Sequence, residues 1–252
     1  MDSILALFVL GVSVGTFGTL VGIGGGIILI PIFTLIFNWS PQHAVGTSLV
    51  VVFLNAVSGS VAYVRQKKVY YDAAIRFSIA TFPGAVIGSY LADYFTGSSF
   101  RTIFGGFLMF VAILMFFRPK QQGGKGSFGE KEFTYNRTLG VLLSTIVGFL
   151  SSILGIGGGV IHVPAMVYLL SFPTHVATAT SHFVLAISTM FGVVSHFILG
   201  NILMKPALAI GIGAVVGAQL GARLSLKVKS QSILVLLSIA LFSLGLRLIF
   251  SA

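Results

Sequence analysis

Eight long apolar stretches, separated by short polar ones, set the pattern of the chain. A helix needs roughly 20 mostly apolar residues to cross a bilayer, and these stretches match or exceed that length. Because they are continuous and do not alternate, they predict helices and not a β-barrel. We therefore expect an all-α integral membrane protein. The stretches are residues 4–37, 42–64, 73–95, 100–117, 138–171, 174–199, 203–226 and 230–250.

The chain matches itself without a gap at an offset of 133 residues. The pentapeptide Gly-Ile-Gly-Gly-Gly at 22–26 falls on an identical one at 155–159, and Pro31 falls on Pro164. Matches that hold one register over such a distance indicate duplication, which is common in secondary transporters. We expect two homologous membrane repeats of four stretches each. The predicted units are repeats at 1–117 and 138–252 and a polar, Gly-rich linker at 118–137.

The first stretch of each repeat is too long for one straight crossing. A helix of about 34 residues would extend about 51 Å, whereas the hydrocarbon core is about 30 Å thick. The glycine triplet near its middle weakens the helix by about 1 kcal/mol per glycine relative to alanine. We expect breaks at Gly24–Gly26 and at Gly157–Gly159. Each break produces either a re-entrant hairpin or two half-helices.

Composition and charge support the membrane assignment. Only 8% of the residues are charged and 56% are hydrophobic, whereas a soluble domain carries about a quarter of charged residues. The net charge of +10 comes from basic residues in short loops, as the positive-inside bias produces, and does not indicate nucleic-acid binding. Basic loops near 65–76, 118–137 and 223–229 are all cytoplasmic only if the second repeat is inverted. We therefore favour inverted over parallel repeats.

The two broken helices offer chemistry that suits an anion. Backbone N–H groups at the start of a half-helix and the helix dipole favour negative charge, and glycine permits close approach. Polar residues recur every seven positions along 42–64 and 174–199, so they share a face and present hydrogen-bond donors. The alternative role for both features is helix–helix packing. The predicted substrate-binding residues are Gly24, Gly25, Gly26, Thr47, Ser48, Asn55, Gly157, Gly158, Gly159, Thr180, Ser181, His182 and Ser188.

Histidine is the residue available to carry a coupling proton, because its charge changes near neutral pH. His182 and His196 lie on the polar stripe of 174–199 and are the candidates. The alternative is that both are neutral hydrogen-bonding groups inside the bundle. The chain has no cysteine and no carboxylate deep in an apolar stretch. We therefore expect no metal, no cofactor and no catalytic residues.

The repeated pattern G-I-G-G-G-x-x-x-x-P resembles the signature of the sulfite exporter TauE/SafE family of membrane proteins. The resemblance extends to P-x-H-A-x-G-T-S at 41–48 and to its variant at 173–181. It implies transport of sulfur-containing anions such as sulfite or organosulfonates, commonly outward, across a bacterial or archaeal cytoplasmic membrane. One departure is that the variant has an extra residue after its histidine, so His43 and His175 are not strict equivalents.

These observations together predict a multi-pass secondary transporter that exports small sulfur-containing anions by alternating access. The alternative is a passive anion channel, which would share every motif. The expected partners are the small anion and the lipid bilayer. The sequence is compatible with a coupling proton and with a homo-oligomer, and it does not fix the number of full crossings or the anion.

Overall fold

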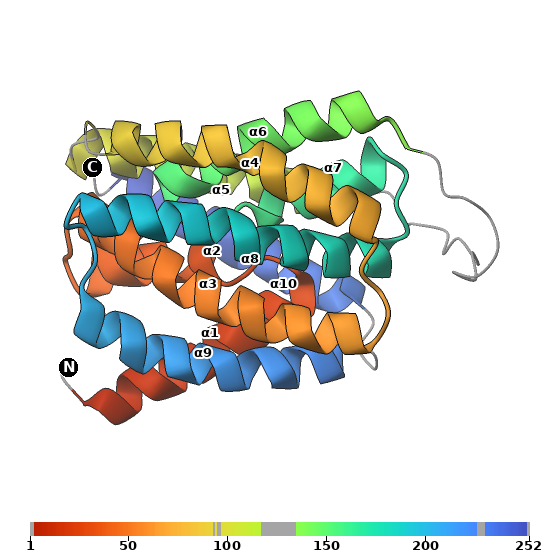
Figure 1. The fold of residues 1–252 in the computed structure, drawn as a ribbon. Coiled ribbons are helices and arrows are strands. Elements are labelled where there is room, and N and C mark those ends of the chain that lie inside the picture. The colour runs from red at the N-terminus through yellow and green to blue at the C-terminus, as the bar shows by residue number, and fades with distance from the viewer. Residues whose placement is uncertain (1–2, 93, 95–96, 117–134, 226–229, 251–252) are drawn as a thin grey trace.

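The computed structural model forms helices and connecting turns, with no strand in the part of the chain that it describes (Figure 1). The all-α prediction is therefore confirmed. The described residues are 3–92, 94, 97–116, 135–225 and 230–250, so most of the predicted linker lies outside them. The helices are α1 (Ile4–Val21), α2 (Gly26–Pro31), a π-helix η1 (Ile32–Ile36), α3 (Pro41–Arg65), α4 (Tyr71–Ala92), α5 (Gly97–Phe116), α6 (Arg137–Leu154), α7 (Gly159–Tyr168), α8 (Thr174–Ile198), α9 (Met204–Leu224) and α10 (Ser230–Phe250).

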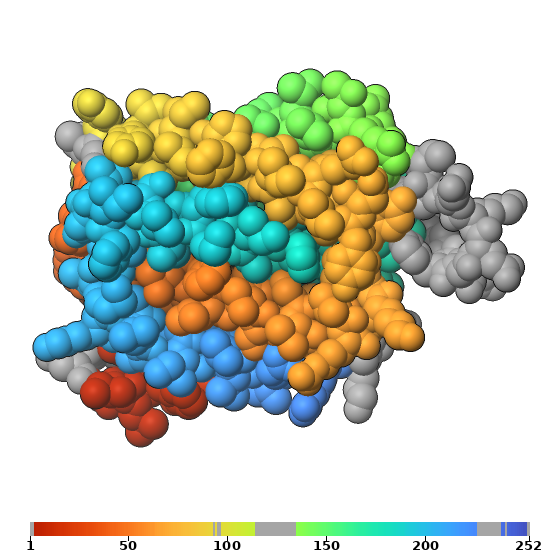
Figure 2. All heavy atoms as spheres, in the orientation of Figure 1, coloured from red at the N-terminus to blue at the C-terminus, as the bar shows by residue number. Residues whose placement is uncertain are grey.

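Helices α1, α3, α4, α6, α8 and α9 are the six that are long and apolar enough to cross a membrane among the described residues. Large apolar side chains cover the outside of this bundle. Ile79 of α4 is 67% exposed and Phe197 of α8 is 63% exposed, and Figure 2 shows the face to which α3, α4, α8 and α9 contribute. Contiguous apolar surface of this kind is unfavourable in water and favourable against lipid tails.

Both glycine motifs break their helices, as the sequence predicts. Helix α1 ends at Gly22, which adopts a left-handed conformation with φ 81°, and Gly25 at the start of α2 has φ 86°. Gly155 and Gly158 repeat this geometry between α6 and α7, with φ 68° and 74°. Residues with a Cβ are strained in that region, whereas glycine is not. The motif therefore produces a sharp reversal at each break.

The chain returns after each break to the end at which it entered. Ile36 and Trp39, at the end of the first broken stretch, line the same cavity as Ile4 at the start of α1. At the end of the second broken stretch, Leu170 lies beside Gly140 at the start of α6. The Leu170 Cδ1 atom is 3.3 Å from the position that a Cβ on Gly140 would take. Each broken stretch is therefore a hairpin and not a pair of half-helices that continue across.

Each hairpin packs against a helix from the other half of the chain. Helix α1 lies parallel to α9, and α6 lies parallel to α4. These contacts join backbones directly, since a Cβ on Gly217 would overlap the Val12 carbonyl and one on Gly84 would overlap the Thr145 carbonyl. Helices α3 and α8 lie against each other, and α5 packs on α10.

Basic side chains gather at one end of the bundle, which we call the basic end. The Gln66 amide, just after α3, donates a hydrogen bond of 3.3 Å to the Ala222 carbonyl near the end of α9. Arg137 at the start of α6 pairs with Asp72 at the start of α4, with 3.6 Å between nitrogen and oxygen. Figure 1 shows these helix ends together, away from the N-terminus. The basic residues there include Arg65, Lys67, Lys68, Arg76, Arg137 and Arg223.

We predict that Gly217→Ala lowers the melting temperature, because the new Cβ would overlap the Val12 carbonyl in α1. Overpacking of this kind costs about 1–3 kcal/mol. Thermal unfolding in detergent measures the change. Gly106→Ala in α5 is the control, since no atom lies within 4 Å of the new Cβ and alanine favours a helix. Equal melting temperatures for both variants would contradict the direct backbone contact.

Candidate functional site

The two glycine motifs meet backbone to backbone inside the bundle. A Cβ on Gly26 would stand 2.6 Å from the Gly155 carbonyl oxygen. Reciprocally, a Cβ on Gly159 would overlap the Gly22 carbonyl oxygen. No side chain fits between the motifs at these positions, so each hairpin tip rests directly on the other. We call this pair of tips the glycine junction (residues 22–26 and 155–159).

Two short helices begin at the glycine junction without a side-chain cap. Neither α2, which follows Gly25, nor α7, which follows Gly158, has a side chain that accepts from its first N–H groups. The first N–H groups of a helix point along its axis and carry partial positive charge. The junction therefore directs two positive helix ends into the protein interior, the feature on which the predicted anion site rests.

Apolar side chains of the central helices lie against the junction. Val52 of α3 and Leu185 of α8 both contact the region of Gly24 and of Gly157, at 2.5–2.9 Å from the Cβ positions of those glycines. Both side chains are fully or almost fully buried. The sequence reasoning missed this pair, because a valine and a leucine in a membrane helix carry no polar signal. They fill the space beside the two loops in this conformation.

Two predicted site residues, Thr47 and Thr180, hold loops in place. Thr47 accepts a 3.0 Å hydrogen bond from the N–H of Leu203, the residue before α9. Thr180 accepts one of the same length from the N–H of Tyr70, the residue before α4. Both hydroxyls therefore accept a hydrogen bond from the backbone of a neighbouring loop. Their role as substrate donors stays a prediction.

Serines at matching positions of α3 and α8 differ in their bonding. Ser48 donates a 2.9 Å hydrogen bond to the carbonyl of Gly155 and so ties α3 to the junction. The Ser181 hydroxyl is buried and has no partner. A buried hydroxyl without a partner is unfavourable unless a ligand or water satisfies it. Ser181 therefore has an unused hydrogen-bond donor, whereas the Ser48 hydroxyl has none to spare.

Asn55, another predicted site residue, belongs to a buried polar network. Its amide nitrogen donates to the Gly15 carbonyl at 3.0 Å, and its amide oxygen accepts from Thr19 at 2.9 Å. The His182 Nε2 atom lies 3.5 Å from the same threonine hydroxyl, and Tyr63 donates to the Thr19 carbonyl. This network joins α1, α3 and α8. Asn55 is thus engaged on both sides of its amide.

In the corresponding part of the second half, several buried hydroxyls have no hydrogen-bond partner. Ser188, at the position that matches Asn55, is buried and its hydroxyl has no partner. Ser151 and Ser152 near the end of α6 also have buried hydroxyls without partners. Ser152 lies close to α8, with its Oγ 3.0 Å from a Cβ position on Gly192, and Ser151 borders Gly158. The sequence reasoning missed both α6 serines, although the internal offset places Ser152 opposite Thr19.

The two candidate proton carriers lie in different surroundings. His182 is fully buried, and its Nδ1 atom has no partner. His196 is also fully buried, but its Nε2 lies 3.1 Å from the Ser152 carbonyl and its Nδ1 lies 3.4 Å from the Asn201 amide. A neutral ring with its proton on Nε2 satisfies both contacts of His196. Of the two histidines, only His182 has a ring nitrogen without a partner.

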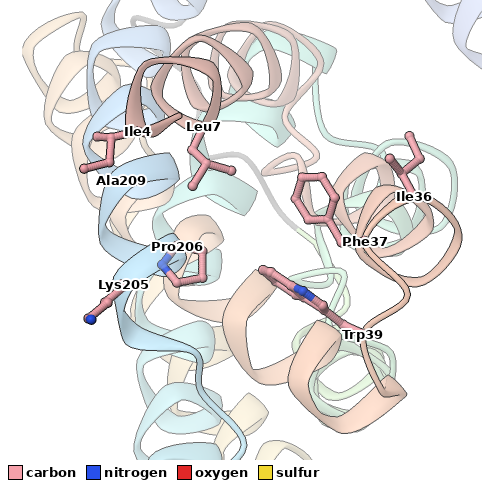
Figure 3. Close-up of a pocket in the computed structure, with 8 residues that line it drawn as sticks. All are labelled: Ile4, Leu7, Ile36, Phe37, Trp39, Lys205, Pro206 and Ala209. Carbon is pink, nitrogen blue, oxygen red and sulfur yellow. The ribbon is translucent and has the colours of Figure 1, made fainter. Parts of the chain in front are cut away.

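A cavity of about 860 Å³ lies at the end of the bundle opposite the basic end. The first hairpin and the start of α9 form its walls, and Figure 3 shows Leu7, Phe37 and Trp39 around its interior. Lys205 extends outward from the rim (Figure 3). The lining residues are Ile4, Leu7, Ile36, Phe37, Trp39, Lys205, Pro206 and Ala209.

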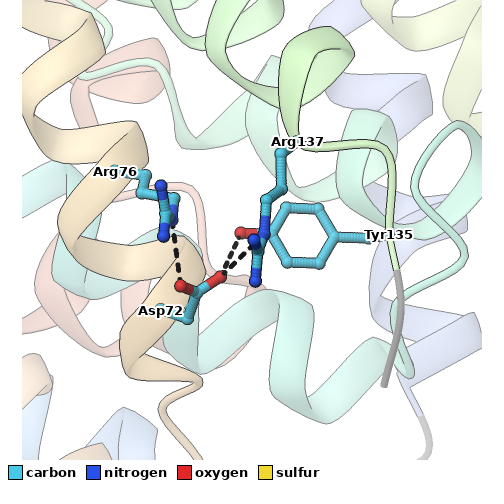
Figure 4. A network of polar contacts seen from close by, with 4 residues as sticks. All are labelled: Asp72, Arg76, Tyr135 and Arg137. Carbon is cyan, nitrogen blue, oxygen red and sulfur yellow. Dashed lines mark hydrogen bonds and ion pairs between the residues drawn. The ribbon is translucent and has the colours of Figure 1, made fainter. Parts of the chain in front are cut away.

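A polar network lies on the surface at the basic end (Figure 4). Asp72 pairs with Arg76 at 2.9 Å and with Arg137 at 3.6 Å, and it accepts a 2.8 Å hydrogen bond from Tyr135. Burial, together with the hydrogen bond to the Asp72 carboxylate, raises the pKa of Tyr135 to about 12. The Tyr135 hydroxyl therefore stays protonated and donates to Asp72 throughout the physiological pH range. Burial lowers the pKa of the nearby Lys68.

Comparisons with known proteins agree with the membrane fold. The model of the family described as "Sulfite exporter TauE/SafE" matches residues 7–248. The chain is 36% identical to the "Probable membrane transporter protein YunE" of Bacillus subtilis, over 98% of both chains. It is 28% identical to the "Probable membrane transporter protein MJ0441" of Methanocaldococcus jannaschii, over 95% of this chain and 93% of that one. No solved structure matches this chain.

We predict different stability effects for alanine substitution of Ser48 and of its counterpart Ser181. Ser48→Ala should destabilise the protein by about 1 kcal/mol, because the Gly155 carbonyl loses its donor. Ser181→Ala should leave the stability unchanged or raise it, because it removes a buried hydroxyl without a partner. Thermal unfolding of the two variants under identical conditions measures the difference. A larger loss for Ser181→Ala than for Ser48→Ala would show that this bonding pattern is wrong.

Proposed function

Because the chain belongs to the sulfite exporter TauE/SafE family, we propose that this membrane transporter exports small sulfur-containing anions by alternating access. Sulfite and short organosulfonates are the substrates that the family name favours. The protein crosses the membrane several times, with six helices suited to the task among the described residues. The anion binds at the glycine junction in this proposal, and the bilayer is the second partner.

The observation that carries the proposal is the meeting of two uncapped helix starts beside buried, unpartnered hydroxyls. The N–H groups at the starts of α2 and α7 are donors without side-chain caps. Ser181 and Ser188 add hydroxyl donors that have no partner within the protein. An oxyanion accepts several hydrogen bonds at once and gains from the positive helix ends. Val52 and Leu185 move aside when the anion enters, since they now occupy the space beside both loops.

Paired contacts support inverted repeats as the basis of alternating access. The Gly26–Gly155 contact has its counterpart in Gly159–Gly22 when each residue is shifted by 133 positions. The Thr47–Leu203 and Thr180–Tyr70 hydrogen bonds are related in the same way. The hairpins enter from opposite ends, as inverted repeats require. The positive-inside bias then places the basic end in the cytoplasm.

His182 is the residue that we propose for proton coupling. It lies between Thr19 and Tyr63, at 3.5 Å from the threonine hydroxyl and with ring centroids 5.7 Å apart from the tyrosine. Its free Nδ1 can take up a proton without breaking a bond within the protein. Protonation of His196, in contrast, would oppose the contact with the Asn201 amide. A cation at His182 would add attraction for an anion at the neighbouring junction.

We predict that Ser181→Ala and Ser188→Ala each raise the KM for sulfite roughly tenfold, the effect of one lost hydrogen bond to an anion. Flux of labelled sulfite in proteoliposomes, with taurine and sulfoacetate as competitors, measures this effect. Ser195→Ala is the control on the same helix, because its hydroxyl donates only to the Phe191 carbonyl. Its KM should stay unchanged.

Two outcomes of the flux experiment would contradict the proposal. Flux no greater than in empty liposomes, with no competition by any of the anions, would remove the sulfur-anion assignment. Voltage-driven flux that never saturates would identify a passive channel in place of an alternating-access transporter.

We predict that the sulfite flux of the wild-type protein rises as the pH falls from 7.5 to 5.5, because a bound anion stabilises the protonated form of the buried His182 and proton uptake in turn strengthens anion binding. His182→Gln keeps a polar group at that place and cannot take up a proton in this range. Its flux should therefore be independent of pH over the same range, after correction for the ionisation of sulfite itself. The matched variant His196→Gln should keep the wild-type slope, and a retained slope in His182→Gln would exclude this histidine as the carrier.

A further inference from the structure

The cavity opposite the basic end has a wall built from the hairpin that carries the first glycine loop. Leu7 lies in the second turn of α1, and Phe37 and Trp39 follow η1, so both arms of the hairpin border the cavity. The same two arms converge at the glycine junction deeper in the bundle. The cavity and the proposed anion site are therefore both bordered by the first hairpin.

Among the described residues that line the cavity, Lys205 alone carries a charge. It lies in the first turn of α9, is exposed, and extends from the rim of the cavity (Figure 3). A lone ammonium at the mouth of an apolar cavity raises the local concentration of small anions. The charge at this mouth is thus of the sign that an anionic substrate requires.

The matching place at the basic end is filled. A shift of 133 positions carries Lys205 to Asp72 and Trp39 to Phe172. Asp72 is held by Arg76, Arg137 and Tyr135, and Phe172 is 1% exposed. The Phe77 ring occupies the position of a Cβ on Gly140, the counterpart of Leu7. One end is therefore hollow where the other is packed and bridged by ion pairs.

We propose that the cavity is the vestibule through which the small anion passes between the glycine junction and the side opposite the basic end, and that Lys205 draws the anion to its mouth. The inference rests on the proposed transport of anions and adds a binding place to it. The matching place at the basic end, which the Phe77 and Phe172 rings fill, is the closed counterpart of the vestibule in this conformation. Alternating access requires that one end is closed while the other is open, since two open ends would make a channel.

Cysteine labelling tests the vestibule without any transport measurement. The chain contains no cysteine, so an introduced one is unique. Ala209 lines the cavity one helical turn after Lys205, about 6 Å away along α9. We would label Ala209→Cys in intact cells and in inverted membrane vesicles with two membrane-impermeant thiosulfonates, one anionic and one cationic. Ala73→Cys at the basic end is the matched control, because Ala73 is fully buried and corresponds to Pro206 of the lining.

The expected result has three parts. Ala209→Cys reacts in intact cells, and Ala73→Cys reacts in neither preparation. When Lys205→Gln is added, the anionic reagent loses about threefold in rate, the effect of one charge at about 6 Å in water, and its rate relative to the cationic reagent falls about tenfold. Sulfoacetate, which does not react with thiosulfonates, slows the reaction of Ala209→Cys, and added salt reduces the preference for the anionic reagent.

Three results would overturn the vestibule. Ala209→Cys that stays unreactive in intact cells would show that lipid tails fill the cavity. A rate ratio unaffected by Lys205→Gln would remove the role of the lysine. Equal reactivity of Ala73→Cys would show that the two ends do not differ. Because the reagents report access and charge alone, each of these failures is distinct from an absence of sulfite flux.

Discussion

The direct backbone contact between the two glycine motifs is the constraint on which the rest of the structure depends. With hydrogen alone at Gly26 and Gly159, each hairpin tip approaches the carbonyl of the other to a distance that no side chain permits. This contact stops both hairpins inside the bundle and leaves the starts of α2 and α7 uncapped there. Two positive helix ends therefore lie close together in the interior, where two continuous helices would have placed none.

The architecture could be predicted from the sequence largely because backbone requirements leave strong signals. The length of the first stretches and the positions of Gly24–Gly26 and Gly157–Gly159 predicted the breaks, which the structure contains. The choice between hairpins and continuing half-helices could not be made, because it depends on contacts between segments far apart in the chain. Thr47 was predicted as a substrate donor on its position, yet its hydroxyl accepts from Leu203, a partner that helical periodicity cannot reveal.

The two halves use matching positions for different purposes. In the first half, Asn55 and Thr19 bond to each other and to the backbone, so the polar groups satisfy one another. In the second half, the smaller Ser188 and Ser152 occupy the corresponding places, and their hydroxyls have no partners. Satisfied networks make a core rigid, whereas unpartnered hydroxyls favour a ligand. In the proposed mechanism, the first half is therefore the more rigid part and the second half offers its hydroxyls to the anion.

The exchange of packing partners between halves has a consequence for how the protein is made. Helix α1 lies along α9, which leaves the ribosome about 200 residues later. Helix α4 likewise packs against α6, which can insert only after the intervening segments. The glycine faces of α1 and α4 must therefore remain in the bilayer without their final neighbours during synthesis. Neither half is a finished unit by itself, so a chain cut at the linker would have to assemble in the membrane as two fragments that complete each other.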